Sequence, residues 1–300
     1  MSASIPPVHP VYAAMGTTVF EEMSAIARET GAINLGQGFP EDDGPAELIE
    51  AAARALRGKS NQYPPIVGLP ELRDSVCRFY RAHQGLNLTR EQVIVTSGAT
   101  EGIACALMAL AQPGDEVILF QPAYDAYAPL VRRCGGVPVS VRLRPPEWRY
   151  READLRAAIT PRTKVVMVND PLNPAGTVAS EADLAMLARV CVEHGLAAIC
   201  DEVWEHVRFD GVRHHSLIDF PGMAERTVKI GSAGKIFGLT GWKVGWMCAA
   251  PDLAAVLARV HQFVTATTPP ALQWAVAEGL AKPVEWFDGR RRNGWNPVLA

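Results

Sequence analysis

The 300-residue sequence lacks a long apolar run and an excess of charge of either sign. No stretch approaches the roughly 20 apolar residues that span a bilayer. The start, MSASIPPVHP, has neither the positive segment nor the apolar segment of a secretion signal. Lysine and arginine (29) nearly balance aspartate and glutamate (32), so no basic surface for nucleic acid or for a membrane is indicated. We therefore expect a cytoplasmic protein that binds neither.

Paired cysteines are also missing. The six cysteines form no CxxC motif, and most of them have apolar neighbours: Cys77, Cys105, Cys134, Cys191, Cys200 and Cys248. Buried thiols in a reducing compartment are therefore expected in place of disulfides or a zinc site. His206, His214 and His215 have no cysteine or carboxylate at a spacing that specifies zinc, so we expect them to be surface or loop histidines and predict no metal.

Three common enzyme motifs do not occur. There is no G-x-S-x-G elbow, and GQGFP opens no helix, so it is not a dinucleotide-binding motif. Gly234-Lys235 superficially suggests a P-loop. However, Lys229 stands where that motif begins with glycine, and Ile236 replaces its serine or threonine. Serine hydrolases, Rossmann dehydrogenases and P-loop nucleotidases are thereby disfavoured.

Short apolar runs alternate with amphipathic stretches from about Val93 to Ala250. The expected strands are 93–96, 116–120, 137–141, 164–168, 197–200, 227–230 and 244–250. Ser180–His194 is typical of a helix, with Ser180 as N-cap. Strands without polar alternation, separated by helices, predict an α/β fold with a mostly parallel sheet covered by helices on both faces. Ligands of such sheets bind beyond the carboxyl ends of the strands.

The flanks of this region are less regular. A helix near Phe20–Thr30 and another ending at Gly58 precede the irregular, proline-rich segment Asn61–Pro70. Leu253–Phe263 and Ala271–Leu280 are expected helices. The ending FDGRRRNGWNPVLA neither completes an apolar element nor resembles a flexible tail, and its three arginines indicate a solvated charge run.

A glycine-rich loop, IGSAGKIFGLTGWKVGW, carries Lys235 directly after a predicted strand. A lysine amine attacks a carbonyl only when it is unprotonated, so burial or a neighbouring positive charge must lower its pKa. A loop at a strand end can provide such a site. The plain alternative is that Lys235 is an exposed loop lysine.

Two further strand ends carry donors. VTSGATEG leads from a strand into a helix whose free N–H groups could seat a phosphate, with the hydroxyl of Thr100 as a further donor; ordinary helix capping is the alternative. In NDPLNPAGTV, the amide of Asn173 could donate to a phenolic oxygen, although Asn173-Pro174 is also typical of a turn.

An acid and an aromatic complete the set. Asp201 ends the apolar strand AAICD, where a carboxylate is costly without a partner such as a protonated pyridine nitrogen. Alternatively, Asp201 or Glu202 accepts hydrogen bonds from a nearby loop. Tyr124 in QPAYDAY could stack on a ring or simply be a buried aromatic. A lysine, an acid, an aromatic, an amide and a phosphate seat at one sheet edge together match the demands of pyridoxal phosphate.

With these motifs, the sequence from about Ile33 to Lys282 resembles the class I/II aminotransferases of the fold-type I pyridoxal-phosphate enzymes. GQGFP, NQYPP and SAGK are most similar to the kynurenine, glutamine and methionine aminotransferase branch. The resemblance implies a large domain with a seven-stranded sheet, pyridoxal 5'-phosphate as cofactor, and a homodimer with shared active sites. It also implies transfer of an amino group from an amino acid to a 2-oxo acid.

The resemblance also implies roles for individual residues. Lys235 is matched to the lysine that forms the Schiff base and moves the substrate proton, and Asp201 to the partner of the ring nitrogen. Tyr63 is matched to a tyrosine that reaches the phosphate of the neighbouring subunit, and Gly38 to the loop over the substrate carboxylate. The remaining implied cofactor-binding residues are Ala99, Thr100, Tyr124, Asn173, Ser232, Lys243 and Trp204, the last standing where the family usually has tyrosine.

The implied domain division is an N-terminal arm with the start of a small domain (1–45), a large cofactor-binding domain (46–282) and an atypical end (283–300). The family continues into a small domain that carries the arginine for the substrate carboxylate, and Arg290, Arg291 and Arg292 do not match it. We therefore expect a C-terminally shortened chain with an incomplete small domain. A cysteine-conjugate β-lyase with the same cofactor site and an inactive shortened product are the alternative functions.

Overall fold

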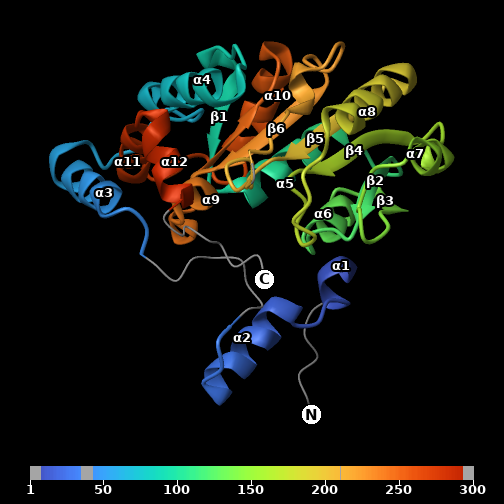
Figure 1. The fold of residues 1–300 in the computed structure, drawn as a ribbon, viewed down its shortest axis with the longest axis horizontal. Helices are drawn as coiled ribbons and strands as arrows, with labels where there is room; N and C mark the ends of the chain where they lie inside the picture. Colours follow the sequence, from blue (N-terminus) through green and yellow to red (C-terminus); the bar gives the residue numbers. More distant parts are fainter. Residues whose placement is uncertain (1–7, 35–42, 210, 293–300) are drawn as a thin grey trace.

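The structure, a computed structural model, describes residues 8–34, 43–209 and 211–292. This part of the chain contains one seven-stranded sheet (Figure 1). Its strands are β1 (Val93–Thr96), β2 (Glu116–Gln121), β3 (Val137–Arg142), β4 (Thr163–Asn169), β5 (Ala197–Asp201), β6 (Thr227–Ser232) and β7 (Gly245–Cys248). Every strand expected from the apolar runs is present.

The strands lie in the order β1-β7-β6-β5-β4-β2-β3. β7 runs antiparallel to both of its neighbours, β1 and β6, whereas the pairs from β6 to β3 are parallel. The predicted α/β class with a mostly parallel sheet is confirmed. Because the parallel strands end at one edge, the polar residues that follow them meet there.

The helices surround this sheet. Their bounds are α1 (Pro10–Ala13), α2 (Val19–Thr30), α3 (Ala46–Gly58), α4 (Pro70–Gln84), α5 (Ala99–Leu110), α6 (Tyr127–Arg133), α7 (Glu152–Ala158), α8 (Glu181–His194), α9 (Ala233–Phe237), α10 (Pro251–Gln262), α11 (Pro270–Leu280) and α12 (Val284–Arg292), with short 3-10 turns η1 (Arg90–Gln92), η2 (Leu217–Asp219) and η3 (Thr240–Trp242). Ser180 caps α8 and forms a reciprocal capping box with Asp183, as the sequence indicates.

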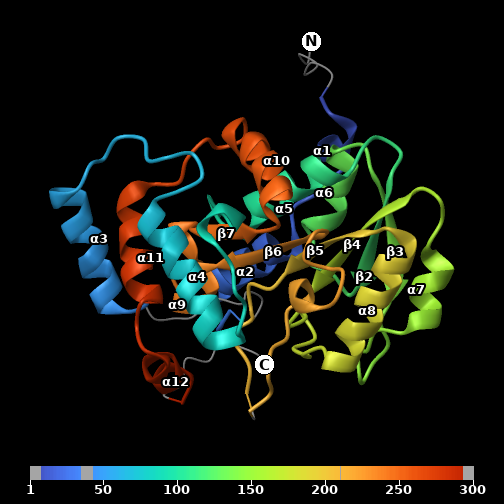
Figure 2. The same cartoon turned by 90° about the horizontal axis from the view of Figure 1, so that it is seen from above.

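Alternation of side chains along each strand fills two apolar layers. On β2, Val117 and Leu119 join the core beneath α5, α6 and α10. Ile118 and Phe120 point to the opposite face and join the core beneath α7 and α8. Figure 2 shows α5, α6 and α10 on one side of the sheet and α4 and α8 on the other. Both faces are therefore covered, as continuous apolar strands require.

A third apolar cluster gathers α3, α4, α9, α11 and α12 over the β1–β7 end of the sheet. Phe287 of α12 is 1% exposed within it. The expectation that the ending from Phe287 completes no apolar element is therefore wrong for Phe287, which packs on Phe237 beside Trp286. The division at residues 45 and 282 stays a prediction.

At the other end of the chain, α2 lies below the sheet in Figure 1. Phe20 of α2 faces Tyr124, with ring centroids 6.4 Å apart. None of the helices in the described residues is both long and apolar enough to cross a membrane. All six cysteines are free thiols, four of them buried, as the sequence predicts.

Candidate active site

A cavity of about 170 Å³ opens at the carboxyl edge of the sheet. Its walls come from the loops that follow β1, β2, β4 and β5 and from the connection between β6 and β7. Nine of the eleven predicted site residues line it: Ala99, Thr100, Tyr124, Asn173, Asp201, Trp204, Ser232, Lys235 and Lys243. Residues that are up to 144 positions apart in the sequence thus meet, as the strand-end argument predicts.

Two predicted residues remain. Tyr63 lies in the irregular segment before α4, and its side chain is 90% exposed. It does not line the cavity of a single chain. Gly38 lies outside the described residues.

Asp201 lies at the end of β5 and is only 5% exposed. One carboxylate oxygen accepts a hydrogen bond from the Tyr127 hydroxyl at 2.5 Å, and the other accepts from the backbone N–H of Val203 at 3.3 Å. Burial nevertheless raises the pKa of Asp201, against the opposing effects of Tyr127, Val203 and the nearby Lys235. The contacts of Asp201 thus do not fully offset the cost of burying its charge, and a cationic partner in the cavity would stabilise the ionised carboxylate.

Lys235 lies on the short helix α9, directly after β6. Burial lowers the pKa of its amine, and the positive charge of Lys243 lowers it further, while Asp201 acts in the opposite direction. Its Nζ lies 4.5 Å from the centroid of the Trp204 ring. The amine is therefore closer to the unprotonated state required of a nucleophile than an exposed lysine would be.

The first turn of α5 forms one end of the cavity. Gly98, its N-cap, has φ +86°, and a side chain there would come within 3.1 Å of Lys243 Nζ. Gly245 is equally restricted, since a Cβ would lie 2.9 Å from the backbone nitrogen of Ala99. These glycines let the Lys243 ammonium approach the helix N-terminus, where unpaired N–H groups attract an anion. Ser232 and Thr100 add hydroxyls to the same wall.

Asn173 is held by the end of β4. Its backbone N–H donates to Asn169 Oδ1 at 2.8 Å, and Asn169 Nδ2 donates to the backbone carbonyl of Asp201 at 2.9 Å. The amide of Asn169 therefore joins the Asn173 loop to the strand end that carries Asp201. Both asparagines line the cavity.

Sequence reasoning did not select Tyr127 or Asn169. Tyr127 stands three residues after Tyr124 in the same aromatic cluster and begins α6, where its hydroxyl reaches Asp201. Asn169 is the last residue of β4, just as Asp201 is the last of β5. The rule that polar residues at strand ends face the ligand would have found Asn169, whereas the partner of Tyr127 depends on the tertiary fold.

The donor set fits pyridoxal 5'-phosphate. Such a cofactor needs an amine for its aldehyde, an anion for its pyridine nitrogen, and cations and N–H donors for its phosphate. The cavity offers Lys235, whose amine has a lowered pKa, and Asp201, a buried carboxylate whose contacts do not fully offset the burial of its charge. The glycine-lined seat beside Lys243 supplies the phosphate donors.

Comparison with known proteins decides the family. A family model described as aminotransferase class I and II matches residues 30–293. The chain belongs to this family. A probable N-succinyldiaminopimelate aminotransferase of Mycobacterium tuberculosis is 45% identical over 280 residues, covering 92% of this chain and 70% of that protein. Methionine aminotransferase of Escherichia coli is 38% identical over 274 residues, covering 91% and 71%.

A solved structure agrees with these matches. That of N-succinyldiaminopimelate aminotransferase from Mycobacterium tuberculosis superposes with a TM-score of 0.92 at 42% identity, covering 96% of this chain and 76% of that one. The protein is thus a pyridoxal-phosphate-dependent aminotransferase of fold type I, as the sequence motifs predict. The names of its relatives favour amino-group transfer over the β-lyase alternative.

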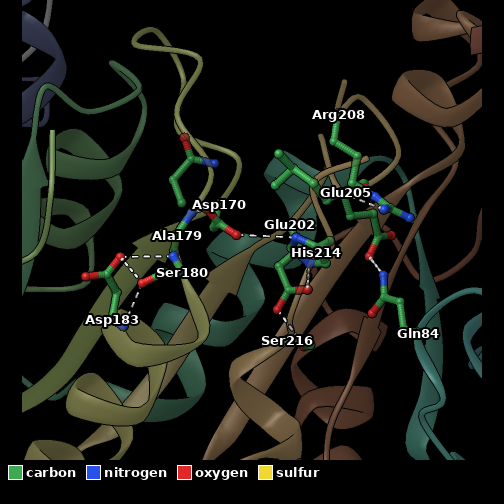
Figure 3. A network of polar contacts seen from close by, with 12 residues as sticks. Gln84, Asp170, Ala179, Ser180, Asp183, Glu202, Glu205, Arg208, His214 and Ser216 are labelled. Atoms are coloured by element: carbon green, nitrogen blue, oxygen red, sulfur yellow. Dashed lines mark hydrogen bonds and ion pairs between the residues drawn. The ribbon is translucent and has the colours of Figure 1, made fainter. Parts of the chain in front are cut away.

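Behind the cavity, the aminotransferase contains a buried charged network (Figure 3). Lys229 on β6 is fully buried and donates to Glu202 and to Glu205, the latter at 2.6 Å. His214 lies between Glu202 and Asp170 and is 3% exposed. Of the two positions expected for these histidines, surface or loop, the loop is correct for His214 and the surface is wrong.

His206 likewise lies in a turn but not at the surface, since it is 5% exposed and packs beside Phe287. The spacing argument looked for zinc ligands along the chain. It could not reveal that the carboxylates beside His214 come from two different strand ends.

Proposed function

We propose that the protein transfers the amino group of an amino acid to a 2-oxo acid, with pyridoxal 5'-phosphate held by Lys235 and Asp201. The convergence of a pKa-lowered lysine, a buried carboxylate and a glycine-lined anion seat on one cavity carries this proposal. When bound, the cofactor supplies an electron sink that eases removal of the substrate Cα proton.

We assign the remaining roles in the reaction to individual residues of the cavity. Lys235 would hold the cofactor through its aldehyde; once the amino group of the substrate has taken the place of the lysine, the freed amine would accept and return the substrate proton as general base and acid. Asp201 pairs with the pyridine nitrogen, and Tyr127 keeps the carboxylate oriented through its 2.5 Å hydrogen bond. Asn173 donates to the phenolic oxygen, and Tyr124 stacks on the ring.

The phosphate is held at the start of α5. Ala99 and Thr100 offer backbone N–H groups, Ser232 a hydroxyl and Lys243 a positive charge. Trp204 stands beside Lys235, and its indole N–H can donate a hydrogen bond but cannot accept one. Its ring face attracts the protonated form of Lys235, which opposes part of the lowering of the lysine pKa by burial.

We propose a homodimer with shared active sites. Tyr63 is 90% exposed in one chain, and Phe263 is 85% exposed, which is unusual for large aromatic side chains of an isolated subunit. Contact with a second copy would cover both, and it would bring Tyr63 to the phosphate of the partner. Gly38 is proposed to lie over the substrate carboxylate. The free state of all six cysteines favours a reducing compartment such as the cytoplasm.

The proposal is tested by locating the bound cofactor. Protein loaded with pyridoxal phosphate is reduced with borohydride, digested and analysed by mass spectrometry. The label is expected on Lys235, while Lys243, the other lysine of the cavity, serves as the internal control. A label mainly on Lys243, or unchanged cofactor absorbance in Lys235→Ala, would refute the assignment.

The substrate is then tested with a donor panel. The names of the relatives suggest N-succinyldiaminopimelate, methionine and kynurenine, each assayed with 2-oxoglutarate. Formation of glutamate is the expected result. Release of pyruvate and ammonia from a cysteine conjugate without any 2-oxo acid would instead support the lyase reaction.

A further inference from the structure

Two buried carboxylates directly follow two residues of the cavity wall. Asp170 follows Asn169 at the end of β4, and Glu202 follows Asp201 at the end of β5. Both are buried, at 3% and 2% exposure. Neither of them lines the cavity, and His214 lies between them (Figure 3). A single imidazole ring thus spans the two strand ends.

The contacts of His214 are charge-assisted. Its Nε2 lies 2.7 Å from Glu202 Oε2, in hydrogen-bond geometry. Its Nδ1 lies 3.3 Å from Asp170 Oδ2, close enough for an ion pair but without the alignment of a good hydrogen bond. Because both neighbours are carboxylates, both ring nitrogens are best satisfied as N–H donors, which requires the imidazolium form.

Asp170 also organises the loop that presents Asn173. Its Oδ1 accepts the backbone N–H of Ala179 at 2.6 Å, at the far end of the loop. Within the loop, Leu172 and Gly176 are joined by a backbone hydrogen bond of 2.7 Å. The residues from 170 to 179 therefore form one compact unit whose base is the Asp170 carboxylate.

We infer that His214 is a positioning residue: it ties the Asn173 loop, through Asp170, to the strand end of Asp201, through Glu202. The distance between the amide of Asn173 and the carboxylate of Asp201 then depends on this bridge from behind the cavity, in addition to the pairing of Asn169 with Asp201 and the 3.1 Å hydrogen bond that the Asp170 backbone N–H donates to the Asp201 carbonyl. The expected effect on cofactor binding rests on the proposed roles of Asn173 and Asp201, whereas the contacts of His214 with Asp170 and Glu202 do not.

Neutralisation of Glu202 alone is a simpler role for His214, and the structure offers a control for it. Ser216 donates to the other oxygen of Glu202 at 2.7 Å and does not contact Asp170. Removing the Ser216 hydroxyl weakens the support of Glu202 without breaking the bridge. Asp170→Asn weakens the bridge from the other side, because an uncharged amide replaces Oδ2 and cannot form an ion pair with the imidazolium, while Oδ1 can still accept from Ala179.

The charge of the bridge can also be followed by pH. Burial would lower the pKa of His214, but the contacts with Asp170 and Glu202 raise it to about 9, against a smaller opposing effect of Lys229. The charged groups near the ring are Asp170 and Glu202, which follow β4 and β5, Lys229 on β6, and Glu205, whose carboxylate has an oxygen within 4.8 Å of a ring nitrogen of His214. Burial would also lower the pKa of Lys229, but its contacts with Glu202 and Glu205 raise that pKa above its ordinary range, so Lys229 stays charged while His214 titrates.

Amide hydrogen exchange of the full chain, with and without pyridoxal phosphate, tests the inference. Protection of peptide 170–179 is compared with that of α8, which cancels the intrinsic pH dependence of exchange. In cofactor-free protein, His214→Gln and Asp170→Asn are expected to speed exchange of the loop about 10-fold or more, as for loss of a buried hydrogen bond to a charged group. Ser216→Ala should match the parent.

Two further readouts complete the test. In the parent, relative protection of the loop should fall as the pH rises through about 9, and this step should be absent in His214→Gln. Both bridge variants should bind pyridoxal phosphate about 10-fold more weakly. The inference is overturned if both variants leave loop exchange unchanged, if Ser216→Ala has an equal effect, or if faster exchange leaves cofactor affinity unaltered. Failure of the proposed function would appear separately, as a borohydride label away from Lys235.

Discussion

Replacing Lys229 by methionine should destabilise the protein strongly, although the residue lies outside the cavity. Lys229 is fully buried, and its ammonium is shared by two carboxylates that are themselves almost inaccessible, Glu202 and Glu205. Methionine keeps a similar length and can still contact the Tyr80 ring, above which Nζ lies at 4.5 Å. The substitution therefore removes the charge with little change in packing.

The size of the expected loss in stability depends on the hydrogen-bond donors that Glu202 and Glu205 keep in the variant. Glu202 keeps His214 and Ser216 as donors. Glu205 keeps only the neutral donors Tyr80 and Gln84 on its carboxylate, at 2.8 and 2.6 Å. Breaking a buried ion pair from one side costs about 3–5 kcal/mol. We expect a loss of that size in the free energy of unfolding, a large share of the 5–15 kcal/mol typical of a domain.

Urea unfolding at pH 7, followed by far-UV circular dichroism and by tryptophan fluorescence, measures this loss. Lys164→Met is the matched control, because Lys164 is exposed on β4 and donates only to a backbone carbonyl; it should change stability by less than about 0.5 kcal/mol. Adding Glu205→Gln to Lys229→Met should recover about 1–3 kcal/mol, since it removes the stranded charge. A Lys229→Met loss below about 1 kcal/mol, or no recovery in the double variant, would refute the reasoning.

Three further predictions concern groups near the cavity. The raised pKa of His214 contributes stability that is complete below the ordinary pKa of 6.5 and is lost as the pH rises to about 9. The free energy of unfolding should fall by up to about 1.4 kcal/mol per pH unit over this range. Thermal unfolding between pH 6 and 10 checks this, and a slope in the parent equal to that in His214→Gln would contradict it. Gly98→Ala should weaken binding of pyridoxal phosphate by pushing Lys243 away. The control Gly114→Ala has a similar φ of +90° with no atom within 4 Å of the added Cβ, and it should cost only about 1 kcal/mol of stability. Equal cofactor affinities of the two variants in a titration would exclude the steric explanation. Tyr127→Phe should raise the pKa of Asp201 further and lower cofactor affinity about 10-fold in the same titration, and unchanged binding would show that the 2.5 Å hydrogen bond is dispensable.

Much of the fold was predictable because its strands are continuous apolar runs, such as VVMV on β4, and because Ser180 and Asp183 mark a helix start. The direction of β7 was not. An apolar run fits a buried strand of either direction, and the antiparallel register, from Ser232 opposite Gly245 to Lys229 opposite Cys248, shows that the chain turns back here.

Most of the candidate site was predictable for a similar reason, since polar residues at parallel strand ends converge. The buried network was not, because Lys229 stands within an apolar run and His214 in a loop. A buried charge is tolerated only when its partners are in place, and those partners come from β5 and the loop after it. Local sequence patterns carry no information about such pairing.

The position of β1 has a consequence for synthesis on the ribosome. β1 is hydrogen-bonded in the sheet only to β7, which is made about 150 residues later. At 5–20 residues per second, β1 waits roughly 8–30 s before it can enter the sheet. The first turn of α5, which follows β1 directly, cannot be placed against Lys243 earlier than that. The nascent chain can therefore bring the start of α5 against Lys243 only after β7 has been made, when the rest of the parallel sheet has had time to form.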